Sequence, residues 1–586
     1  MKGKNMRRYI NFFCREQFSD RLFLLNEGYS MVHRFTIGLV IGDEKIMVID
    51  AGLGMTNDLR SYIEQIVGTD RPIICVCTHG HRDNVGSACQ FDEAYCSHKD
   101  LESGESPFDS IQRYCDLVDY SLESSIVMDY CRRHMIMNNR CEMKDLNDGD
   151  IFDLGGVKIE AIAVPGHSAG SFAFYNAEEK YCFTGDAVNT DVHLQNLDPE
   201  GFRTYRASME RLLTRISPET VIYPAHLPLP MTTDIIRSLI HITDDIIAQN
   251  VEKDPPAESI FHGKNNNRNI RGHYYNNTCI IYDRNKIGLA DVKPDYDAVC
   301  YYSHEKWTDR IYTVTINPST VNRITLMVFI GDEKILLIDS GHGIDDRLRT
   351  YIESFAGSGK PMILALTHIG IDHGGAATLF DEVYLHQNDI GKIPRSLEKN
   401  NRLGDVQPFS NYNKEFEEYT LKHIIERIDE NAVKEVNDGD VFHLGNLDVE
   451  AIFTPGHSQG HMAYYCAAEK IAFTGDAMNV DTHLKGPNDR QFFLNYAKML
   501  QNFLDRVDPD TKIFSAHLNR PHSMRVPRNI QAACLELAAG QTFGDAPGEA
   551  IQKHTNGFHN PNTREHYHGL SCVVYNIKTL NSSPAD

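Results

Sequence analysis

Histidine and aspartate residues recur at short spacing in the first half of the chain. They occur in THGHRDN, PGHS, TGD and PAH, in this order. Two histidines separated by one loop residue can converge on one ion, and imidazoles together with carboxylates suit a borderline divalent ion such as zinc. Iron(II) or manganese could use the same set. The candidate ligands are His79, His81, Asp83, His167, Asp186 and His226.

The second half of the chain carries the same residue types in the same order. CTHGHRDNVG is matched by LTHIGIDHGG, VPGHSAGSFAFY by TPGHSQGHMAYY, and CFTGDAVNTDVHL by AFTGDAMNVDTHL, while PAHL returns as SAHL. The sequence therefore predicts a second group of metal ligands. The candidates are His368, Asp372, His373, His457, Asp476 and His517.

These matches belong to a repeat of half the chain. FTIGLVIGDEKIMVIDAGLG begins at Phe35, and ITLMVFIGDEKILLIDSGHG begins at Ile324, 289 positions later. Later blocks keep nearly the same spacing and the same order, which indicates one large duplicated domain and excludes a solenoid of short repeats. We expect the two domains to span 1–290 and 291–586, with the join in DRNKIGLADVKP around Gly288.

Short strands and helices must position these side chains. KIMVID and KILLID are β-branched runs that predict strands ending at Asp50 and Asp339, and IICVCTH and MILALTH predict buried strands ending at a histidine. The apolar residues of NDLRSYIEQIVG have helical spacing, and FAFYNAEEKYCFTGD predicts a hairpin with its turn near Asn176 and Glu178. We expect an α/β fold with two sheets, helices outside, and a site on loops at one edge.

The charge and the apolar content narrow the function classes. The 586 residues carry a net charge of −23 and are 41% hydrophobic, which is enough for large cores. An acidic surface repels phosphate backbones and anionic lipid heads, so we expect no nucleic acid and no membrane among the partners. No apolar run is long enough to span a bilayer, and the N-terminus lacks a signal-peptide core. The 14 cysteines, without a CxxC pair, predict free thiols in a cytoplasmic protein.

The motifs, taken in order, resemble those of the metallo-β-lactamase superfamily. These are the strand-end Asp of IDAG, the HxHxDH loop, the His of PGHS, the Asp of TGD and a late His, and the resemblance covers nearly the whole of both copies. It implies an αββα sandwich, duplicated in tandem. It also implies one or two Zn²⁺ ions per domain, with Fe²⁺ or Mn²⁺ as alternatives.

The resemblance further implies how the ligands divide between two metals. In the family, the first two histidines of HxHxDH and the PGHS histidine hold one metal, the Asp and third His of the loop and the late His hold the other, and the TGD Asp bridges. One metal would then take His79, His81 and His167 or, in the second copy, His368 and His457. The other would take Asp83 and His226 or Asp372, His373 and His517, with Asp186 or Asp476 bridging. Asp50 and Asp339 fit better as residues that support the ligands.

Each copy departs from the motif at a different position. In the first copy Asn84 replaces the third loop histidine, and an amide oxygen is a poor substitute for imidazole at zinc. In the second copy Gly370 replaces the second histidine, and His342, where the first copy has Leu53, could fill that gap. We expect both copies to bind metal, the first most tightly at its three-histidine site and the second at its Asp/His/His site.

The expected reaction is hydrolysis of a small acyl substrate, which could be an ester, a thioester, a lactone or an amide. A bound divalent ion lowers the pKa of water to about 7 and polarises a carbonyl oxygen. Asp83 and Asp372 could move a proton between the water and the leaving group, which makes them the predicted catalytic residues. Two alternatives stay open: an iron-dependent oxygenase or sulfur-handling enzyme on the same fold, and a non-catalytic metal-binding scaffold.

Four further histidines are candidates for substrate contact. His193 and His483 follow TGD in the same register, and His273 and His566 open the last strand of each copy. Each could instead support a loop or a sheet edge. We also expect the two copies to form an internal pseudo-dimer, because duplicated domains often replace a homodimer interface, and a further oligomer is left open.

Overall fold

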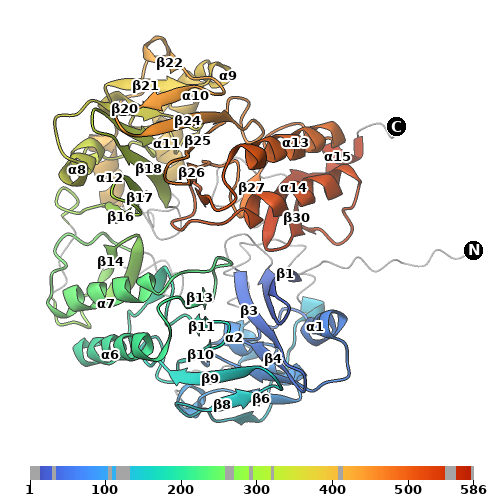
Figure 1. Cartoon of the computed structure of the whole chain (residues 1–586). Coiled ribbons are helices and arrows are strands. Elements are labelled where there is room, and N and C mark those ends of the chain that lie inside the picture. Colours follow the sequence, from blue (N-terminus) through green and yellow to red (C-terminus); the bar gives the residue numbers. More distant parts are fainter. Residues whose placement is uncertain are drawn as a thin grey trace, which may run out of the picture. The chain divides into compact units, whose positions relative to one another are not determined.

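The computed structural model of the chain divides into two compact units (Figure 1). The first comprises residues 1–247, 540–553 and 558–570, and the second comprises residues 248–539, 554–557 and 571–586. The predicted join near residue 290 falls on residues 290–294, which lie outside the described residues, so that boundary stays a prediction. The structure describes residues 13–28, 34–102, 108–113, 132–257, 269–289, 295–317, 323–406, 414–547 and 562–582.

Two sheets form the centre of the first unit (Figure 1). The first sheet has strands in sequence order: β1 Phe13–Ser19, β2 Leu22–Gly28, β3 Arg34–Ile41, β4 Ile46–Ile49, β5 Ile73–Val76, β6 Glu93–Tyr95 and β7 Met143–Lys144. The second sheet has the order β13 Val221–Pro224, β11 Tyr181–Gly185, β10 Phe172–Asn176, β9 Lys158–Ala163 and β8 Ile151–Asp153. The predicted hairpin is confirmed, since β10 and β11 pair antiparallel. A short strand, β12, covers Asp191–His193.

The second unit repeats these two sheets. Its first sheet runs β16 Tyr302–Lys306, β17 Ile311–Ile316, β18 Ile324–Ile330, β19 Ile335–Ile338, β20 Met362–Ala365, β21 Glu382–Leu385 and β22 Lys434–Glu435. Its second sheet runs β23 Val441–His443, β24 Asp448–Phe453, β25 Met462–Cys466, β26 Ile471–Phe473 and β28 Lys512–Phe514. The unit also contains the antiparallel hairpin of β14 Ile270–Tyr275 and β15 Thr278–Asp283, and the parallel pair of β27 Asp481–His483 and β31 Ser571–Asn576.

Helices cover the outer faces of the sheets in each unit, which completes the αββα arrangement. In the first unit they are α1 Leu59–Val67, α2 Arg82–Val85, α3 His98–Leu101, α6 Pro199–Arg215 and α7 Asp234–Ile247. In the second they are α8 Leu348–Ala356, α9 Gln387–Ile390, α10 Ile393–Ser396, α11 Lys399–Val406, α12 Lys414–His423, α13 Arg490–Arg506, α14 Arg525–Ala538 and α15 Ile577–Ser582. Two short strands, β29 Ala546–Pro547 and β30 Thr563–His568, pair antiparallel in the first unit.

The alternation of side chains along β4 explains why the first sheet packs against helix α1 on one face and against the second sheet on the other. Ile46 and Val48 belong to the core cluster that includes α1, whereas Met47 and Ile49 belong to the cluster that includes β9, β10 and β11. Successive strand residues point to opposite faces, so a strand made only of apolar residues is buried on both sides. The helix predicted from NDLRSYIEQIVG is confirmed as α1, which buries Leu59 on this sheet.

Buried arginines hold the loop that follows β4 in the first unit and β19 in the second. Arg113 donates to the carbonyl oxygen of Leu53 at 3.1 Å, and Arg402 donates to that of His342 at 3.0 Å. Both side chains are almost fully buried. Burying a guanidinium group costs free energy unless its N–H groups donate hydrogen bonds. Each arginine therefore stabilises the one conformation of this loop that offers it the carbonyl oxygen.

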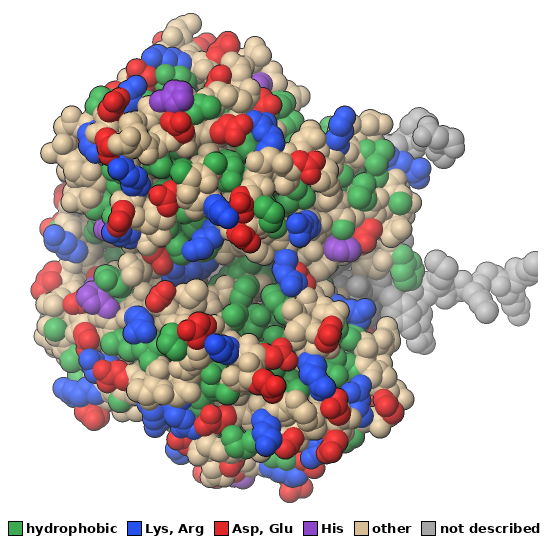
Figure 2. All heavy atoms as spheres, viewed as in Figure 1, with side chains coloured by type: hydrophobic (Ala, Val, Ile, Leu, Met, Phe, Trp, Pro, Cys, Tyr) green, Lys and Arg blue, Asp and Glu red, His purple; other side chains and the backbone are tan. Residues whose placement is uncertain are grey.

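The described chain shows mixed surface charge. On the face seen in Figure 2, lysine and arginine side chains are interspersed with aspartate and glutamate. Among the described residues, no helix has the length and apolar character needed to cross a membrane. The cysteines in this part of the chain are free thiols.

Glu27 is a buried carboxyl group peculiar to the first unit. It accepts hydrogen bonds from the backbone N–H groups of Leu53 at 2.7 Å and Met55 at 3.1 Å, and Ile316 stands at the matching position of the second copy. Burial outweighs these hydrogen bonds and raises the pKa of Glu27 to about 7. Between pH 4.5 and about 7, Glu27 is therefore protonated in the folded unit, whereas in the unfolded chain its carboxyl group has released the proton.

We predict that the Glu27→Gln variant gains stability relative to the wild type as pH rises. Between pH 4.5 and about 7 the folded state binds more protons at Glu27 than the unfolded state, so wild-type stability falls by up to about 3 kcal/mol. Circular dichroism during urea unfolding at pH 5 and pH 8 measures the difference. Fluorescence of Trp307, the one tryptophan, follows the second unit as an internal control. A stability difference that does not change with pH would contradict the prediction.

Candidate metal centre

Three imidazoles meet one carboxylate in the first unit. The ring centroids of His79, His81 and His167 lie 4.5 to 4.9 Å apart. Asp186 Oδ2 lies 3.6 Å from Nε2 of both His79 and His167. One ligand atom from each of these four residues lies within 4.8 Å of the others, which is the spacing expected around a single ion.

A second group adjoins this one through the same carboxylate. His226 Nε2 lies 3.4 Å from Asp83 Oδ2 and 3.4 Å from Asp186 Oδ1, so Asp186 stands between the two groups. Burial opposes protonation of His226, but Asp186 and Asp83 outweigh it and raise the His226 pKa to about 9. His226 also has a positive φ of 62°, which is uncommon for a residue with a side chain and often marks a functional site.

Asn84 lies beside both groups of the first unit. Its Nδ2 is 3.2 Å from Asp83 Oδ1 and 3.4 Å from His79 Nε2. The Asp83–Asp186–His226 group therefore has an amide where the usual motif has an imidazole. Burial raises the pKa of the neighbouring Asp50 to about 8, and the carboxylates of Asp186 and Asp83 add to that rise.

The second unit has the complementary arrangement. His373 Nε2 lies 3.5 Å from oxygens of both Asp372 and Asp476, and His517 Nε2 lies 3.4 Å and 3.2 Å from oxygens of the same two residues. His373 Nδ1 is 2.8 Å from Asp339 Oδ2, which orients the ring so that Nε2 faces the carboxylates. Burial opposes ionisation of Asp372, but His373 and His517 outweigh it and lower its pKa.

The other group of the second unit contains His368, His457 and Asp476. A Cβ atom built on Gly370 would lie 2.8 Å from His368 Nε2 and 2.6 Å from His373 Cδ2. The backbone at Gly370 therefore runs so close to the ligands that a side chain there requires them to move.

His342 lies outside these groups of ligand atoms. Its Nε2 is 2.8 Å from Asp405 Oδ2, so the structure places it in a pair with that carboxylate instead of in the gap left by Gly370. Another histidine, His461, contacts the ligands and was not predicted from the sequence. It is buried, and its ring stacks on that of His368 with centroids 5.1 Å apart. Its Nε2 accepts a hydrogen bond from the backbone N–H of Asp476 at 3.2 Å, so His461 supports the site.

Two further carboxylates connect the ligand loops and were also missed. Asp100 accepts hydrogen bonds from the backbone N–H of Gly80 at 2.9 Å and from the hydroxyl of Ser168 at 2.7 Å. Asp389 accepts from the hydroxyl of Ser458 at 2.8 Å in the second unit. Each joins the loop of the first histidines to the PGHS loop. The matching spacing of SHKD and HQND in the two copies was the available signal.

The four candidate substrate-contact histidines have structural contacts. The backbone oxygen of His193 lies 3.2 Å from His167 Nδ1, and that of His483 lies 2.8 Å from His457 Nδ1. A carbonyl can only accept, so each PGHS histidine carries its proton on Nδ1 and presents the Nε2 lone pair to the site. His273 and His566 pair with carboxylates, those of Asp254 and Asp545, at 2.9 Å. Their role toward a substrate stays a prediction.

The donor atoms fit a divalent metal ion. The Nε2 atoms of His368, His373 and His457 are buried and have no hydrogen-bond partner among the described residues. Burial lowers the pKa of His79, His368 and His457 well below the ordinary value, so these rings are neutral and offer lone pairs. Neutral imidazoles converging with carboxylates are the ligand set that zinc, iron(II) or manganese takes.

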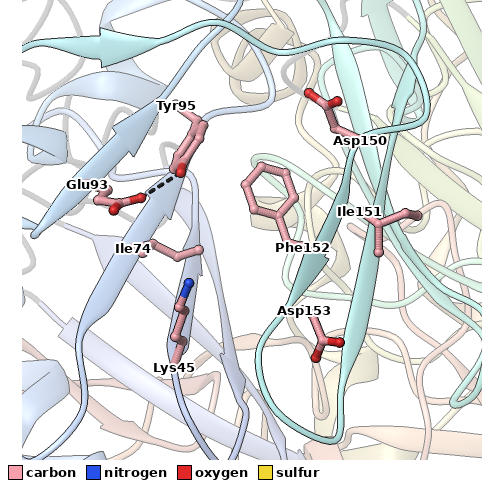
Figure 3. Close-up of a pocket in the computed structure, with 8 residues that line it drawn as sticks. All are labelled: Lys45, Ile74, Glu93, Tyr95, Asp150, Ile151, Phe152 and Asp153. Atoms are coloured by element: carbon pink, nitrogen blue, oxygen red, sulfur yellow. Dashed lines mark hydrogen bonds between the residues drawn. The ribbon is translucent and has the colours of Figure 1, made fainter.

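A pocket of about 290 Å³ lies elsewhere in the first unit (Figure 3). Its lining includes Lys45, which precedes β4, and Glu93 and Tyr95 of β6, which hydrogen-bond to each other at 2.6 Å. The candidate ligands follow the opposite ends of β4 and β5. This pocket therefore lies at the edge of the sheets away from the metal centre and has no part in its chemistry.

We predict that the Asn84→His variant raises the metal content of the first unit from one ion to two. An imidazole at this position would join Asp83, Asp186 and His226 and would lie beside Asp50, as His373 lies beside Asp339. Metal per chain after dialysis can be measured by mass spectrometry in a chain whose second site is removed by Asp372→Ala and His373→Ala. An unchanged metal content would contradict the prediction.

We predict that Gly370→Ala weakens metal binding in the second unit by roughly tenfold, because the added methyl group meets His368 and His373. The matched control is Gly391→Ala, since a Cβ atom there meets nothing within 4 Å. Competition with a chromogenic chelator measures both affinities. Equal affinities in the two variants would show that the approach at Gly370 has no consequence.

The chain is similar to known proteins in both copies of the repeat. The family model of the metallo-β-lactamase superfamily matches residues 144–226 and 321–517. The chain is 27% identical over 233 residues to the human acyl-coenzyme A thioesterase MBLAC2, covering 37% of this chain and 82% of the relative. It is 26% identical over 197 residues to the probable metallo-hydrolase YybB of Bacillus subtilis, and this match covers 32% of this chain and 78% of the relative.

A solved structure of a beta-lactamase domain protein from Burkholderia ambifaria aligns with 41% of this chain and 74% of its own, with 18% identity and a TM-score of 0.30. The order of the motifs, the two pairs of sheets and the family match lead to one assignment. The chain belongs to the metallo-β-lactamase superfamily and is a hydrolase enzyme of that superfamily.

Proposed function

We propose that this protein hydrolyses the acyl bond of a small molecule at a divalent metal, with thioesters as the preferred substrate class. The observation that carries the proposal is the convergence, in both units, of imidazole and carboxylate ligand atoms within 4.8 Å of one another. The choice of thioester is supported by the relatives named as acyl-coenzyme A thioesterases. Zinc is the first candidate for the metal, because histidine-rich sites with a bridging carboxylate suit it.

The metal would be held differently in the two units. In the first unit His79, His81 and His167 with Asp186 would hold the tighter ion, since this group has four ligands. In the second unit the tighter ion would lie between Asp372, His373 and His517, with Asp476 shared between the groups. A bound divalent ion supplies Lewis acidity toward a carbonyl oxygen and lowers the pKa of a coordinated water to about 7.

The chain's own groups would move the proton. Asp83 lies 3.4 Å from His226 and belongs to the incomplete group of the first unit, so one of its oxygens can accept a proton from a nucleophilic water and pass it to the leaving group. Asp372 has the matching position beside His517. A thiolate is a better leaving group than an amine at neutral pH, so a thioester makes less demand on this proton transfer.

We predict that single ligand substitutions separate the activities of the two units. His81→Ala removes a ligand of the first unit and His373→Ala one of the second, and loss of the ion should lower turnover in that unit by at least about a hundredfold. Release of thiol from an acyl-coenzyme A, followed with a thiol reagent, measures the rate. His443→Ala is the matched control, because this histidine is exposed and pairs with Asp448 on the surface.

The outcomes distinguish three cases. If each substitution removes part of the rate, both units are catalytic. If one removes all of it, the other unit has a different role. If zinc-loaded wild type releases no thiol and cleaves no ester or lactone, the proposed function is wrong.

A further inference from the structure

Segments from each copy of the repeat lie in the compact unit of the other copy. The hairpin β14–β15 closes the first copy in sequence and belongs to the second unit. Residues 562–570, with β30, belong to the second copy in sequence and to the first unit. In both units the contacts of these segments lead to the late histidine ligand.

The turn of the β14–β15 hairpin is anchored within the second unit. Asn276 and Asn277 form a two-residue turn with φ of 47° and 53°, as expected between closely paired strands. Asn277 is 1% exposed, donates to Thr313 Oγ1 at 2.7 Å and accepts from the hydroxyl of Ser303 at 3.1 Å. Its amide is therefore bonded on both sides by the first sheet of that unit.

The loop that carries His517 is bound to this turn. Asn519 donates from Nδ2 to the backbone oxygen of Asn277 at 2.9 Å, and the guanidinium of Arg520 donates to the hydroxyl of Thr278 at 2.5 Å. Thr278 and Arg520 are buried, so water competes little for the bond between their side chains. Two residues that closely follow the ligand are thus fixed by a turn from the first copy.

In the first unit, different contacts connect the late histidine, His226, to a segment of the second copy. His226 Nδ1 lies 3.1 Å from the backbone oxygen of Arg34 and must donate to it, which leaves Nε2 for the metal. The guanidinium of Arg34 donates to the backbone oxygen of Leu570 at 2.8 Å and lies 5.4 Å from the ring centroid of Tyr567. Leu570 is buried in the core between the two sheets.

We propose that each metal site is held in shape by a positioning segment from the other copy. Asn277 and Thr278 position His517, and Tyr567 and Leu570 position His226 through Arg34. Contacts of this kind orient a ligand without touching the ion, and their loss typically weakens metal binding by about ten- to a hundredfold. A copy cut at the repeat boundary would therefore lack part of what positions its own late histidine. Only the metal measurement below rests on the proposed function.

Hydrogen exchange of the full chain tests this crossed dependence. Asn277→Gly keeps the positive φ of the turn but removes the amide, and Tyr567→Leu removes the ring beside Arg34. Asn277→Gly should raise exchange several-fold in peptides covering 515–520 and not in those covering 224–229. Tyr567→Leu should do the reverse, so each variant is the control for the other. If Asn277→Gly unfolds the chain, Thr278→Ala, which removes one acceptor of Arg520, is measured in the same way.

Zinc affinity gives the second readout. The second site is measured in a His79→Ala, His81→Ala chain, and the first in an Asp372→Ala, His373→Ala chain. Asn277→Gly should weaken zinc binding about tenfold at the second site alone, and Tyr567→Leu at the first alone. Variants that act on the site of their own copy, or on neither, overturn the inference. Crossed exchange in a wild type that binds no zinc would retain the inference and reject the proposed function.

Discussion

Both sites depend on one hydrogen bond, which a buried aspartate accepts from the start of the ligand loop. The aspartate is Asp50 after β4 in the first unit and Asp339 after β19 in the second. Asp50 and Asp339 have positive φ values of 63° and 62°, a backbone strain that surrounding contacts must offset. Asp50 accepts the backbone N–H of Thr78 at 2.7 Å, and Asp339 accepts that of Thr367 at 2.8 Å. Since the first histidine follows that threonine, the carboxylate determines where the ligand loop begins.

The two copies use this carboxylate in different ways. In the second unit Asp339 also orients His373, so a buried acid and a buried base offset each other. In the first unit Asn84 stands in place of that histidine. Burial there raises the pKa of Asp50 to about 8. The two copies therefore lose an imidazole at different positions, and the buried carboxylate beside each site has different neighbours. Each site keeps four imidazoles and two carboxylates, but in different positions, so the two sites need not prefer the same metal or substrate.

The sequence predicted the strands and the first helix well, because apolar β-branched runs and helical spacing depend on local geometry. The structure brings the candidate ligands close together, and their binding of metal stays a prediction. The supporting residues were harder to predict. Asp100 and Asp389 are single carboxylates outside any motif, and His461 stands where the first copy has Ser171. The placement of the β14–β15 hairpin was also out of reach. A repeat shows that two segments are equivalent, but it does not show against which copy each one packs.

An anomalous difference map at the zinc edge, from crystals of the full chain grown with zinc, tests the central claim most directly. We predict a strong peak in the first unit within about 2.0–2.2 Å of His79, His81, His167 and Asp186. We also predict a strong peak in the second unit between Asp372, His373, His517 and Asp476. Peaks absent from both places, or located away from these side chains, would contradict the assignment of the two metal sites.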